Sequence, residues 1–292
     1  MPAPSDMGAR VLVLGGSGYI GSRVVSYLRA LNHDLTVVDL QLRGDPGGIG
    51  GLQMDYRDVP RSMMGEHDAV VLLAAHSSVG QAIRDPTGAF RNNVTGLFDL
   101  IDKLDDQLLV YATTSSVYDG CGGGLVTEEH PTFLPRNMYD LSKYVGDALL
   151  GVVRPDAIGL RLGTVVGVSA NQRNDLMLNA MVKSARQEGV VRVFNPDVHR
   201  PILALSDLER AVGSILARDI PLGGLYNMCS FNITPRAAGV AVSEYTGARL
   251  DIDEDATDTY DFSMAAARFE EAAGFHFAAT MDEILGELVA HY

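Results

Sequence analysis

The sequence predicts an α/β protein with a doubly wound parallel sheet and a smaller C-terminal domain. Short apolar runs alternate with segments whose apolar residues recur at helical spacing, which is typical of a parallel sheet covered by helices on both faces. A glycine-rich stretch separates the first apolar run from the first helical segment, and an acidic residue ends the second run. The chain has 292 residues, of which 47% are hydrophobic and 21% charged, and this composition indicates an ordinary globular protein.

The elements follow one another in a regular order. Five apolar runs are the predicted strands: residues 10–14, 35–40, 69–75, 108–112 and 157–162. Three segments with helical periodicity are the predicted helices: residues 19–31, 87–104 and 138–152. We also expect residues 198–217 to return to the main domain as a strand followed by a helix.

The stretch GGSGYIGS follows the first predicted strand and opens the first helix. Its residues Gly15, Gly18 and Gly21 form the pattern G-x-x-G-x-x-G, in which glycine permits a tight turn and lets backbone amides approach a pyrophosphate. The start of the helix, with Tyr19 and Ile20, adds unpaired N–H groups and a favourable dipole. In this strand–turn–helix context the loop predicts a Rossmann-type dinucleotide site that contains these five residues.

Asp39 ends the second predicted strand, 18 residues after Gly21. A carboxylate at this place can accept both ribose hydroxyls of adenosine and would repel a 2′-phosphate, so we expect NAD rather than NADP, although Arg43 lies nearby. Asp55, followed by Tyr56, lies between the predicted strands 35–40 and 69–75, where an acid can reach the adenine amino group.

These patterns predict two domains. Residues 1–165 form the NAD-binding Rossmann domain, to which residues 198–228 return. Residues 166–197 and 229–292 form the substrate-binding domain, because the composition changes after about residue 165 and Pro-Gly breaks appear, among them Pro221-Leu222-Gly223-Gly224.

Tyr139 and Lys143 lie four residues apart on a predicted helix, so their side chains share one face. A phenol with a pKa of about 10 is a poor base at neutral pH, and a nearby ammonium stabilises its phenolate. Tyr139 can then exchange a proton with a hydroxyl while hydride moves to a nicotinamide. Thr114 lies at the carboxyl end of the strand 108–112 and can hydrogen-bond the reacting oxygen.

Together these motifs resemble the extended short-chain dehydrogenase/reductase family, and within it the NAD-dependent nucleotide-sugar epimerases of the UDP-glucose 4-epimerase type. The resemblance covers residues 10–275. It is carried by the segments GGSGYIGS, LLAAHSSV, NNVTG, YATTSSVY, YDLSK and LRLGTVVG. It implies that Thr114, Tyr139 and Lys143 are catalytic and that Leu73, Ala74, Ala75 and Asn93 line the cofactor.

The same resemblance implies a substrate site for a nucleotide diphosphate sugar. The stretch VRVF, followed by HRPILALSDL, is similar to the family's nucleotide-binding segment, and Arg200 matches its diphosphate-binding arginine. The implied substrate contacts are Ser78, Ser115, Asn174, Asp175, Asn179, Val193 and Arg200. A surface ion pair is the alternative role for Arg200.

Three departures from the family pattern bear on the reaction. Thr164 stands where the family often has Asn, and Asp255 lies where a second phosphate-binding arginine is often found. Ser115-Ser116 stand where sugar dehydratases have Asp-Glu, and sugar-acid decarboxylases have Glu at the position of Ser116. These differences argue against dehydration and decarboxylation.

The leading hypothesis is therefore an epimerase that oxidises a nucleotide-linked sugar to a ketosugar and returns the hydride to the other face. A ketoreductase or dehydrogenase that exchanges NAD(H) in each turnover needs the same three residues, so residue types do not separate the two. A non-catalytic NAD(H) sensor is the third alternative, against which the intact catalytic set argues.

Charge and cysteine content limit the partners. The net charge of −14 disfavours nucleic acid and membrane surfaces, and no apolar run approaches the length of a membrane span. Two cysteines form neither a disulfide framework nor a zinc set, and no metal site is expected. The stretch MPAPSDMGAR lacks an apolar signal core, so we expect a cytoplasmic protein, and the resemblance implies a homodimer that pairs the 87–104 and 138–152 helices.

Overall fold

The computed structural model describes residues 8–132, 135–217, 223–255 and 257–292, so residues 1–7 and the break at Pro221-Leu222 lie outside it. The described chain divides into two units. The first comprises residues up to Val117, Leu134–Arg161 and Glu209–Tyr226, and the second comprises Tyr118–Phe133, Leu162–Leu208 and Asn227–Tyr292. Within the described residues, no helix is both long enough and apolar enough to span a membrane.

The first unit contains a seven-stranded sheet in the order β11-β7-β5-β4-β1-β2-β3. Its strands are β1 (Arg10–Leu14), β2 (Asp34–Asp39), β3 (Leu52–Gln53), β4 (Ala69–Leu72), β5 (Leu108–Thr114), β7 (Ile158–Leu162) and β11 (Gly224–Met228). The pairs of β1 with β2 and with β4, of β2 with β3 and of β4 with β5 are parallel. This arrangement confirms the predicted Rossmann-type parallel sheet.

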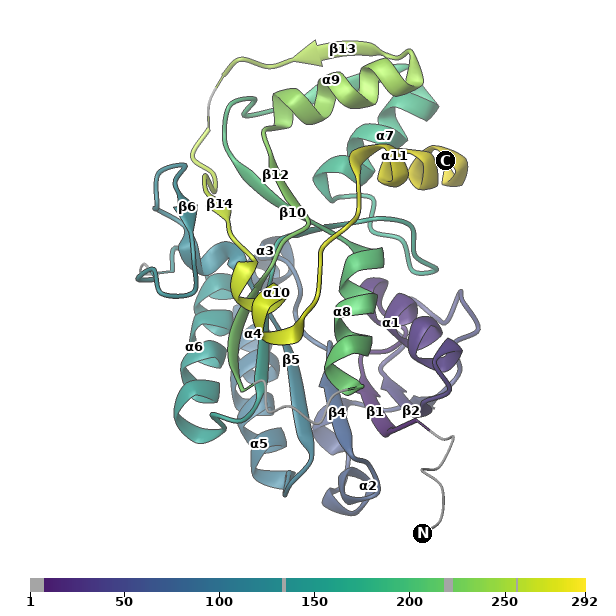
Figure 1. The fold of residues 1–292 in the computed structure, drawn as a ribbon, viewed down its shortest axis with the longest axis vertical. Coiled ribbons are helices and arrows are strands. Elements are labelled where there is room, and N and C mark those ends of the chain that lie inside the picture. The colour runs from purple at the N-terminus through teal and green to yellow at the C-terminus, as the bar shows by residue number, and fades with distance from the viewer. Residues whose placement is uncertain (1–7, 133–134, 218–222, 256) are drawn as a thin grey trace. The chain divides into compact units, whose positions relative to one another are not determined.

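Helices cover the sheet (Figure 1). They are α1 (Tyr19–Ala30), α2 (Arg61–Gly65), α3 (Val79–Arg84), α4 (Pro86–Phe90), α5 (Gly96–Lys103), α6 (Met138–Val153) and α8 (Leu205–Leu216), with short helical turns η1 (Tyr56–Asp58), η2 (Arg91–Thr95) and η3 (Ser115–Tyr118). Successive side chains of each strand point to opposite faces of the sheet. Leu12 and Leu14 pack with Leu97 of α5 and Leu150 of α6, whereas Gly16 lies against Val37 and against Val25 of α1.

The predicted helix over 87–104 is interrupted by a π-helical turn, η2, between α4 and α5. The phenol of Tyr56 is buried below it and donates a hydrogen bond to the carbonyl of Asn92. A Cβ at Gly96 would lie 2.3 Å from that phenol oxygen, so glycine leaves room for the inserted ring. A side chain that enters the hydrogen-bond ladder is an established cause of such an irregularity.

The second unit has its own core and three small sheets. Its strands are β6 (Leu125–Val126), β8 (Thr164–Val166), β9 (Val190–Val193), β10 (Arg200–Ala204), β12 (Phe231–Ile233), β13 (Arg249–Ile252) and β14 (Ser263–Met264), and its helices are α7 (Met177–Glu188), α9 (Pro235–Thr246), α10 (Ala267–Ala273) and α11 (Met281–His291). Within residues 198–217, the strand β10 pairs with β8 and β12 in one of these small sheets. The main sheet takes β11 as its edge strand.

Candidate active site

The strand order of the main sheet reverses between β1 and β4, and ligands of such sheets bind at this point. The loops that follow these two strands are in contact. Gly15 has a φ of +92°, and a Cβ on it would lie 2.5 Å from the amide nitrogen of Ala74. The amides of Leu73 and Ala74 both donate to the carbonyl of Leu14, at 2.8 and 2.9 Å. The predicted strand over 69–75 therefore ends at Leu72, and its last residues turn over the glycine loop.

The glycine loop continues into α1 without a side-chain cap. Gly18 is the N-cap residue of α1, and Tyr19 and Ile20 begin the helix. A Cβ on Gly21 would lie 2.1 Å from the carbonyl oxygen of Gly15, so only glycine allows the turn to close this tightly. The result is a helix N-terminus directly after the glycine loop, and the dipole of such an N-terminus suits a pyrophosphate.

Asp39 lies beside the glycine loop and is held there by backbone amides. Its Oδ2 accepts from the amide of Ser17 at 3.0 Å, and its Oδ1 accepts from the amide of Gln41 at 2.7 Å. A half-buried carboxylate fixed next to a phosphate cradle has the placement needed to accept ribose hydroxyls. The tight turn and this carboxylate together fit a dinucleotide such as NAD.

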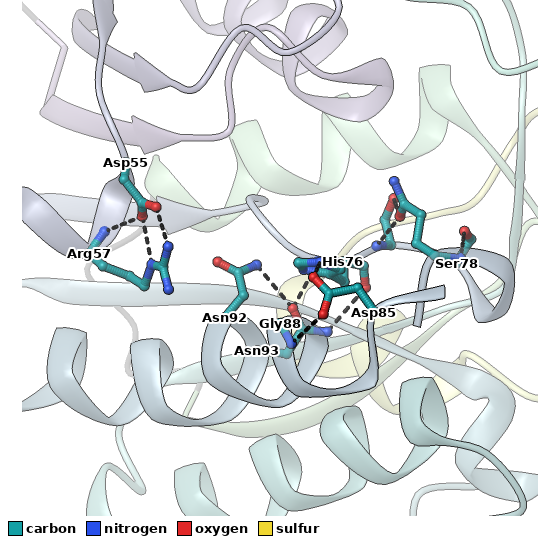
Figure 2. Close-up of polar contacts among 10 residues, drawn as sticks. Asp55, Arg57, His76, Ser78, Asp85, Gly88, Asn92 and Asn93 are labelled. Atoms are coloured by element: carbon teal, nitrogen blue, oxygen red, sulfur yellow. Dashed lines mark hydrogen bonds and ion pairs between the residues drawn. The ribbon is translucent and has the colours of Figure 1, made fainter. Parts of the chain in front are cut away.

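Asp55 lies at the N-terminus of η1, and its carboxylate is paired with Arg57 (Figure 2). Arg57 Nε donates to Asp55 Oδ1 at 2.9 Å, and its guanidinium holds the pKa of Asp55 below the usual range. The side chain of the neighbouring Tyr56 points into the core, and burial raises the pKa of its phenol. A cofactor contact of Tyr56 is therefore restricted to its backbone.

Asn93, in η2, uses its whole amide inside the protein (Figure 2). Its Oδ1 accepts from the amide of His76 at 2.9 Å, and its Nδ2 donates to the carbonyl of His76 and to Ser142 Oγ at 3.1 and 3.0 Å. Asn93 thus ties the loop after β4 to α6, and its contact with the cofactor stays a prediction. Ser78, in the same loop, caps α3 by accepting from the amide of Gln81.

The helix α6, which carries Tyr139 and Lys143, contacts the carboxyl half of β5. Asn137 is its N-cap residue, Tyr139 lies in its first turn, and Lys143 follows one turn later. Lys143 Nζ donates to the carbonyl of Ala112 at 2.9 Å and lies 3.4 Å from the hydroxyl of Tyr111. The contacts of Lys143 with β5 bring the helix that carries Tyr139 to the strand that ends with Thr114.

Burial dominates the electrostatics of Lys143. It lowers the pKa of the ammonium from 10.5 to about 8, and the carboxylate of Asp147 opposes this effect. Asp147 is itself buried with Arg161, whose Nε donates to Asp147 Oδ2 at 2.8 Å. Burial raises the pKa of Asp147, whereas Arg161 lowers it.

Thr114 is 8% exposed and ends β5. Its hydroxyl lies 3.0 Å from Ser116 Oγ, which in turn donates to Asp140. Ser115 is also buried, in η3. The buried position of the Asp140 carboxylate, adjacent to Tyr139, could not be assigned from the sequence, because a polar residue at the third position of a helix is most often solvated.

Arg200 lies in the second unit and is half-buried. Its guanidinium donates to Thr259 Oγ1 at 2.6 Å and lies 5.6 Å from the centre of the ring of Tyr260. In the part of the chain that the structure describes, Arg200 forms no ion pair, which disagrees with the alternative of a surface ion pair. Burial lowers the pKa of this guanidinium. A cation without a bound carboxylate suits a phosphate ligand.

Two of the predicted substrate residues have other roles in the second unit. Asn179 is fully buried on α7, where its Oδ1 accepts from the amide of Gly167 and its Nδ2 donates to the carbonyl of Arg173. Val193 is fully buried in β9, and its carbonyl accepts from the amide of Asp253. Both side chains are buried, and the substrate contacts expected of these two residues stay predictions.

Asn174 and Asp175, which are also predicted substrate residues of the second unit, are exposed. Asn174 Oδ1 accepts from the hydroxyl of Tyr292 at 2.6 Å. Asp175 is paired with Arg173 at 2.6 Å. Both remain accessible to a ligand.

The sequence matches a family model described as "NAD dependent epimerase/dehydratase family" over residues 11–229. The UDP-glucose 4-epimerase of Halalkalibacterium halodurans is 29% identical over 143 residues, which cover 46% of this chain and 42% of that enzyme. The GDP-6-deoxy-D-mannose reductase of Pseudomonas aeruginosa is 26% identical over 246 residues, which cover 77% of this chain and 75% of that enzyme. The chain thus matches less than half the length of the UDP-glucose 4-epimerase.

The structure is similar to that of a UDP-glucose-4-epimerase from Stenotrophomonas maltophila with bound NAD and formylated UDP-arabinopyranose. The TM-score is 0.84 at 24% sequence identity, and the match covers 97% of each chain. A similarity of this extent at this identity shows a common fold.

Proposed function

The chain belongs to the NAD dependent epimerase/dehydratase family, and on that premise we propose that it is an NAD-dependent epimerase of nucleotide-linked sugars. The observation that carries the proposal is the anchoring of Lys143 to the carbonyl of Ala112. This contact joins the Tyr139 helix to the strand that ends with Thr114, which supports a site in which the three groups act together.

Different residues of the chain would bind different parts of NAD. Gly15, Gly18 and Gly21 would cradle the pyrophosphate of NAD, and Asp39 would hold its adenosine ribose. NAD, when bound, would take up a hydride from the sugar carbon and return it to the opposite face.

Tyr139 would take the proton of the sugar hydroxyl and later give it back. The ammonium of Lys143 would favour the phenolate, because an opposite charge stabilises the ionised form. Thr114 would hydrogen-bond the reacting oxygen at the end of β5.

The nucleotide end of the substrate would bind the second unit at Arg200. A planar guanidinium can bind two phosphate oxygens at once. Arg200 forms no ion pair among the described residues, although the more distant carboxylates of Asp261 and Asp119 raise its pKa. Asn174 and Asp175 stay in the proposed substrate site because they are exposed.

Mass spectrometry of ligands released from the purified protein tests the cofactor, and we expect NAD. The protein is then mixed with UDP-glucose, UDP-galactose and a panel of dTDP-, GDP- and CDP-sugars, and the products are examined by NMR. Interconversion of epimers without added cofactor supports the proposal. Stoichiometric consumption of added NAD or NADH would instead identify a dehydrogenase or ketoreductase, the reaction type of the Pseudomonas relative.

The sensor alternative is tested by Tyr139→Phe. This variant should retain bound NAD and lose epimerisation, because only the proton-transferring hydroxyl is removed. If sugar turnover is absent in the wild type and the biological effect of the protein survives in the variant, the protein is a binding module.

We also propose a homodimer that forms through the helices α3 to α6. Five large apolar side chains are exposed on these helices: Ile83, Phe90, Phe98, Val152 and Val153. Exposed apolar side chains gathered on one set of helices are typical of an interface. Light scattering should give a dimer for the wild type and a monomer for Phe98→Glu, whereas Leu42→Glu, at a loop residue that is 86% exposed, should remain a dimer.

The proposed compartment is the cytoplasm. Cys121 and Cys229 are both free thiols, in keeping with a reducing environment. Fractionation of cells that express the protein tests this location.

A further inference from the structure

The hydroxyl of Tyr292 binds the segment that links β8 to α7. Tyr292 is the C-cap residue of α11, and the segment comprises residues 167–176 of the same unit. Gln172 Nε2 donates to the Tyr292 hydroxyl oxygen at 3.1 Å, and this hydroxyl donates to Asn174 Oδ1 at 2.6 Å. One phenol therefore connects two side chains of a segment that contains predicted substrate residues.

The orientation of the Gln172 side chain is fixed by the backbone of its own segment. The amide of Ser169 donates to Gln172 Oε1 at 2.9 Å, and Gln172 Nε2 donates to the carbonyl of Gly167 at 3.3 Å. A backbone amide is only a donor and a carbonyl is only an acceptor, so the oxygen and nitrogen of this side chain are not interchangeable. The group that Gln172 presents to Tyr292 is therefore an N–H donor.

The phenol of Tyr292 gives its own proton to Asn174. Its oxygen accepts from Gln172, so the single hydroxyl proton is available for the second contact. The distance of 2.6 Å to Asn174 is typical of an O–H···O bond and shorter than the usual N–H···O distance of about 2.9 Å. Burial raises the pKa of this phenol, although the hydrogen bond from Gln172 opposes the effect, so the hydroxyl stays protonated at neutral pH. The atom of Asn174 that faces Tyr292 is therefore its oxygen.

The nitrogen of the Asn174 side chain is the group left for a ligand. Asn174 is exposed, and its Nδ2 donates to no residue in the part of the chain that the structure describes. The NH2 group of an asparagine has two protons and is only a donor. Held in this orientation, Asn174 presents a donor that is complementary to an oxygen of a ligand, such as a phosphate oxygen or a sugar hydroxyl.

We propose that Tyr292 is a positioning residue of the substrate site, which fixes Asn174 so that its Nδ2 donates to an oxygen of the nucleotide-linked sugar. The proposal rests on the proposed epimerase function and adds a residue that no motif of the sequence indicated. In this role Tyr292 acts through Asn174 and not by contact with the substrate. Without the phenol the exposed amide can turn over and present its oxygen, so the preorganised donor is lost.

Calorimetric titration with UDP-glucose, UDP and uridine tests the proposal. Tyr292→Phe keeps the ring and removes only the hydroxyl, and we expect it to bind UDP-glucose about threefold to tenfold more weakly, since one hydrogen bond contributes on this scale. A loss confined to UDP-glucose assigns the acceptor to the sugar, a loss shared with UDP assigns it to the diphosphate, and a loss shared with uridine assigns it to the nucleoside. Tyr245→Phe, at a half-exposed tyrosine of α9, is the matched control and should bind like the wild type.

Two further variants separate positioning from structural damage. Once Asn174→Ala has removed the donor, loss of the phenol removes nothing more, so Tyr292→Phe with Asn174→Ala should bind UDP-glucose as weakly as Asn174→Ala alone. Asn174→Asp should bind it more weakly than Asn174→Ala, because an acceptor with a negative charge replaces the donor.

Steady-state kinetics give a second readout. Tyr292→Phe should raise KM and leave kcat within twofold of the wild type, which is the pattern of a lost contact that the ground state and the transition state share. The proposal is overturned if Tyr292→Phe binds UDP-glucose with the affinity of the wild type, or if the effects of Tyr292→Phe and Asn174→Ala multiply.

A last measurement needs no ligand. The 15N relaxation of the Asn174 side-chain amide, assigned by its loss in Asn174→Asp, is compared between the wild type and Tyr292→Phe. The order parameter of this amide should fall in the variant, because the hydrogen bond that holds it is gone, and an unchanged value would overturn the proposal. If the wild type binds none of the UDP-, dTDP-, GDP- and CDP-sugars, the proposed function fails, and the relaxation measurement still decides whether Tyr292 fixes Asn174.

Discussion

Replacement of Lys143 by Met tests how much the buried ammonium of Lys143 lowers the free energy of unfolding. Lys143 is 4% exposed, and burial lowers the pKa of its ammonium from 10.5 to about 8. At about 1.4 kcal/mol per pH unit, this difference corresponds to about 3 kcal/mol by which a charged Lys143 destabilises the folded state at neutral pH.

The sign of the pH dependence follows from this lowered pKa. Below pH 8 the ammonium is charged in both the folded and the unfolded chain, so the destabilisation is complete. Between pH 8 and 10.5 the folded protein releases the proton while the unfolded chain keeps it, and the folded state gains stability as the pH rises. The methionine variant has no such group and lacks this gain.

The assay is urea denaturation of the wild type and of Lys143→Met at pH values from 7 to 10.5. The difference between their free energies of unfolding should change by about 3 kcal/mol in favour of the wild type across this range. The lost hydrogen bond to the carbonyl of Ala112 shifts the difference by a constant and does not change its slope. Lys183→Met, at a half-buried lysine of α7, is the control and should leave the slope unaltered. A flat difference between pH 7 and 10.5 would refute the desolvation of Lys143.

Three further outcomes are expected from the described contacts. Asp39→Ala should weaken NAD binding by about 10- to 100-fold in calorimetry and reduce the preference for NAD over NADP, because a charge-assisted hydrogen-bond acceptor is lost. Equal affinities of the wild type and the variant for NAD would contradict this role of Asp39. Gly21→Ala should abolish dinucleotide binding, since its Cβ would lie 2.1 Å from a backbone carbonyl, whereas Gly151→Ala, on α6 with no atom within 4 Å, should raise the unfolding free energy by about 0.5–1 kcal/mol. Asp147→Asn should destabilise the protein by about 3–5 kcal/mol in urea denaturation because the buried Arg161 loses its partner, and a loss below 1 kcal/mol would show that water reaches the pair.

Patterns with a strict local period predicted most of the main domain. The alternation of apolar runs and amphipathic segments placed five of the seven sheet strands, and the glycine spacing identified the turn after β1. These features are predictable because they depend on backbone geometry and on burial within a few residues.

Side-chain roles that depend on contacts far apart in the sequence were not predictable. Asn93 and Asn179 stand in polar segments that resemble ligand-binding sequences, yet their amides satisfy backbone groups of other loops. The partnership of Ser116 with Asp140 joins residues 24 positions apart, and no periodic pattern marks it. The pairing of β10 with β8 and β12 was not predicted, because an apolar run does not specify its neighbour.

The fully satisfied amide of Asn93 has a mechanical consequence. It is hydrogen-bonded to His76, in the loop beside the glycine turn, and to the hydroxyl of Ser142 on α6. The hydroxyl of Ser142 in turn donates to the carbonyl of Tyr139. A displacement of that loop by an incoming ligand would therefore pull on the first turn of α6. The Asn93 amide therefore couples the position of a bound dinucleotide to the orientation of the Tyr139 phenol. In Asn93→Ala, the loop and the first turn of α6 would move independently of each other.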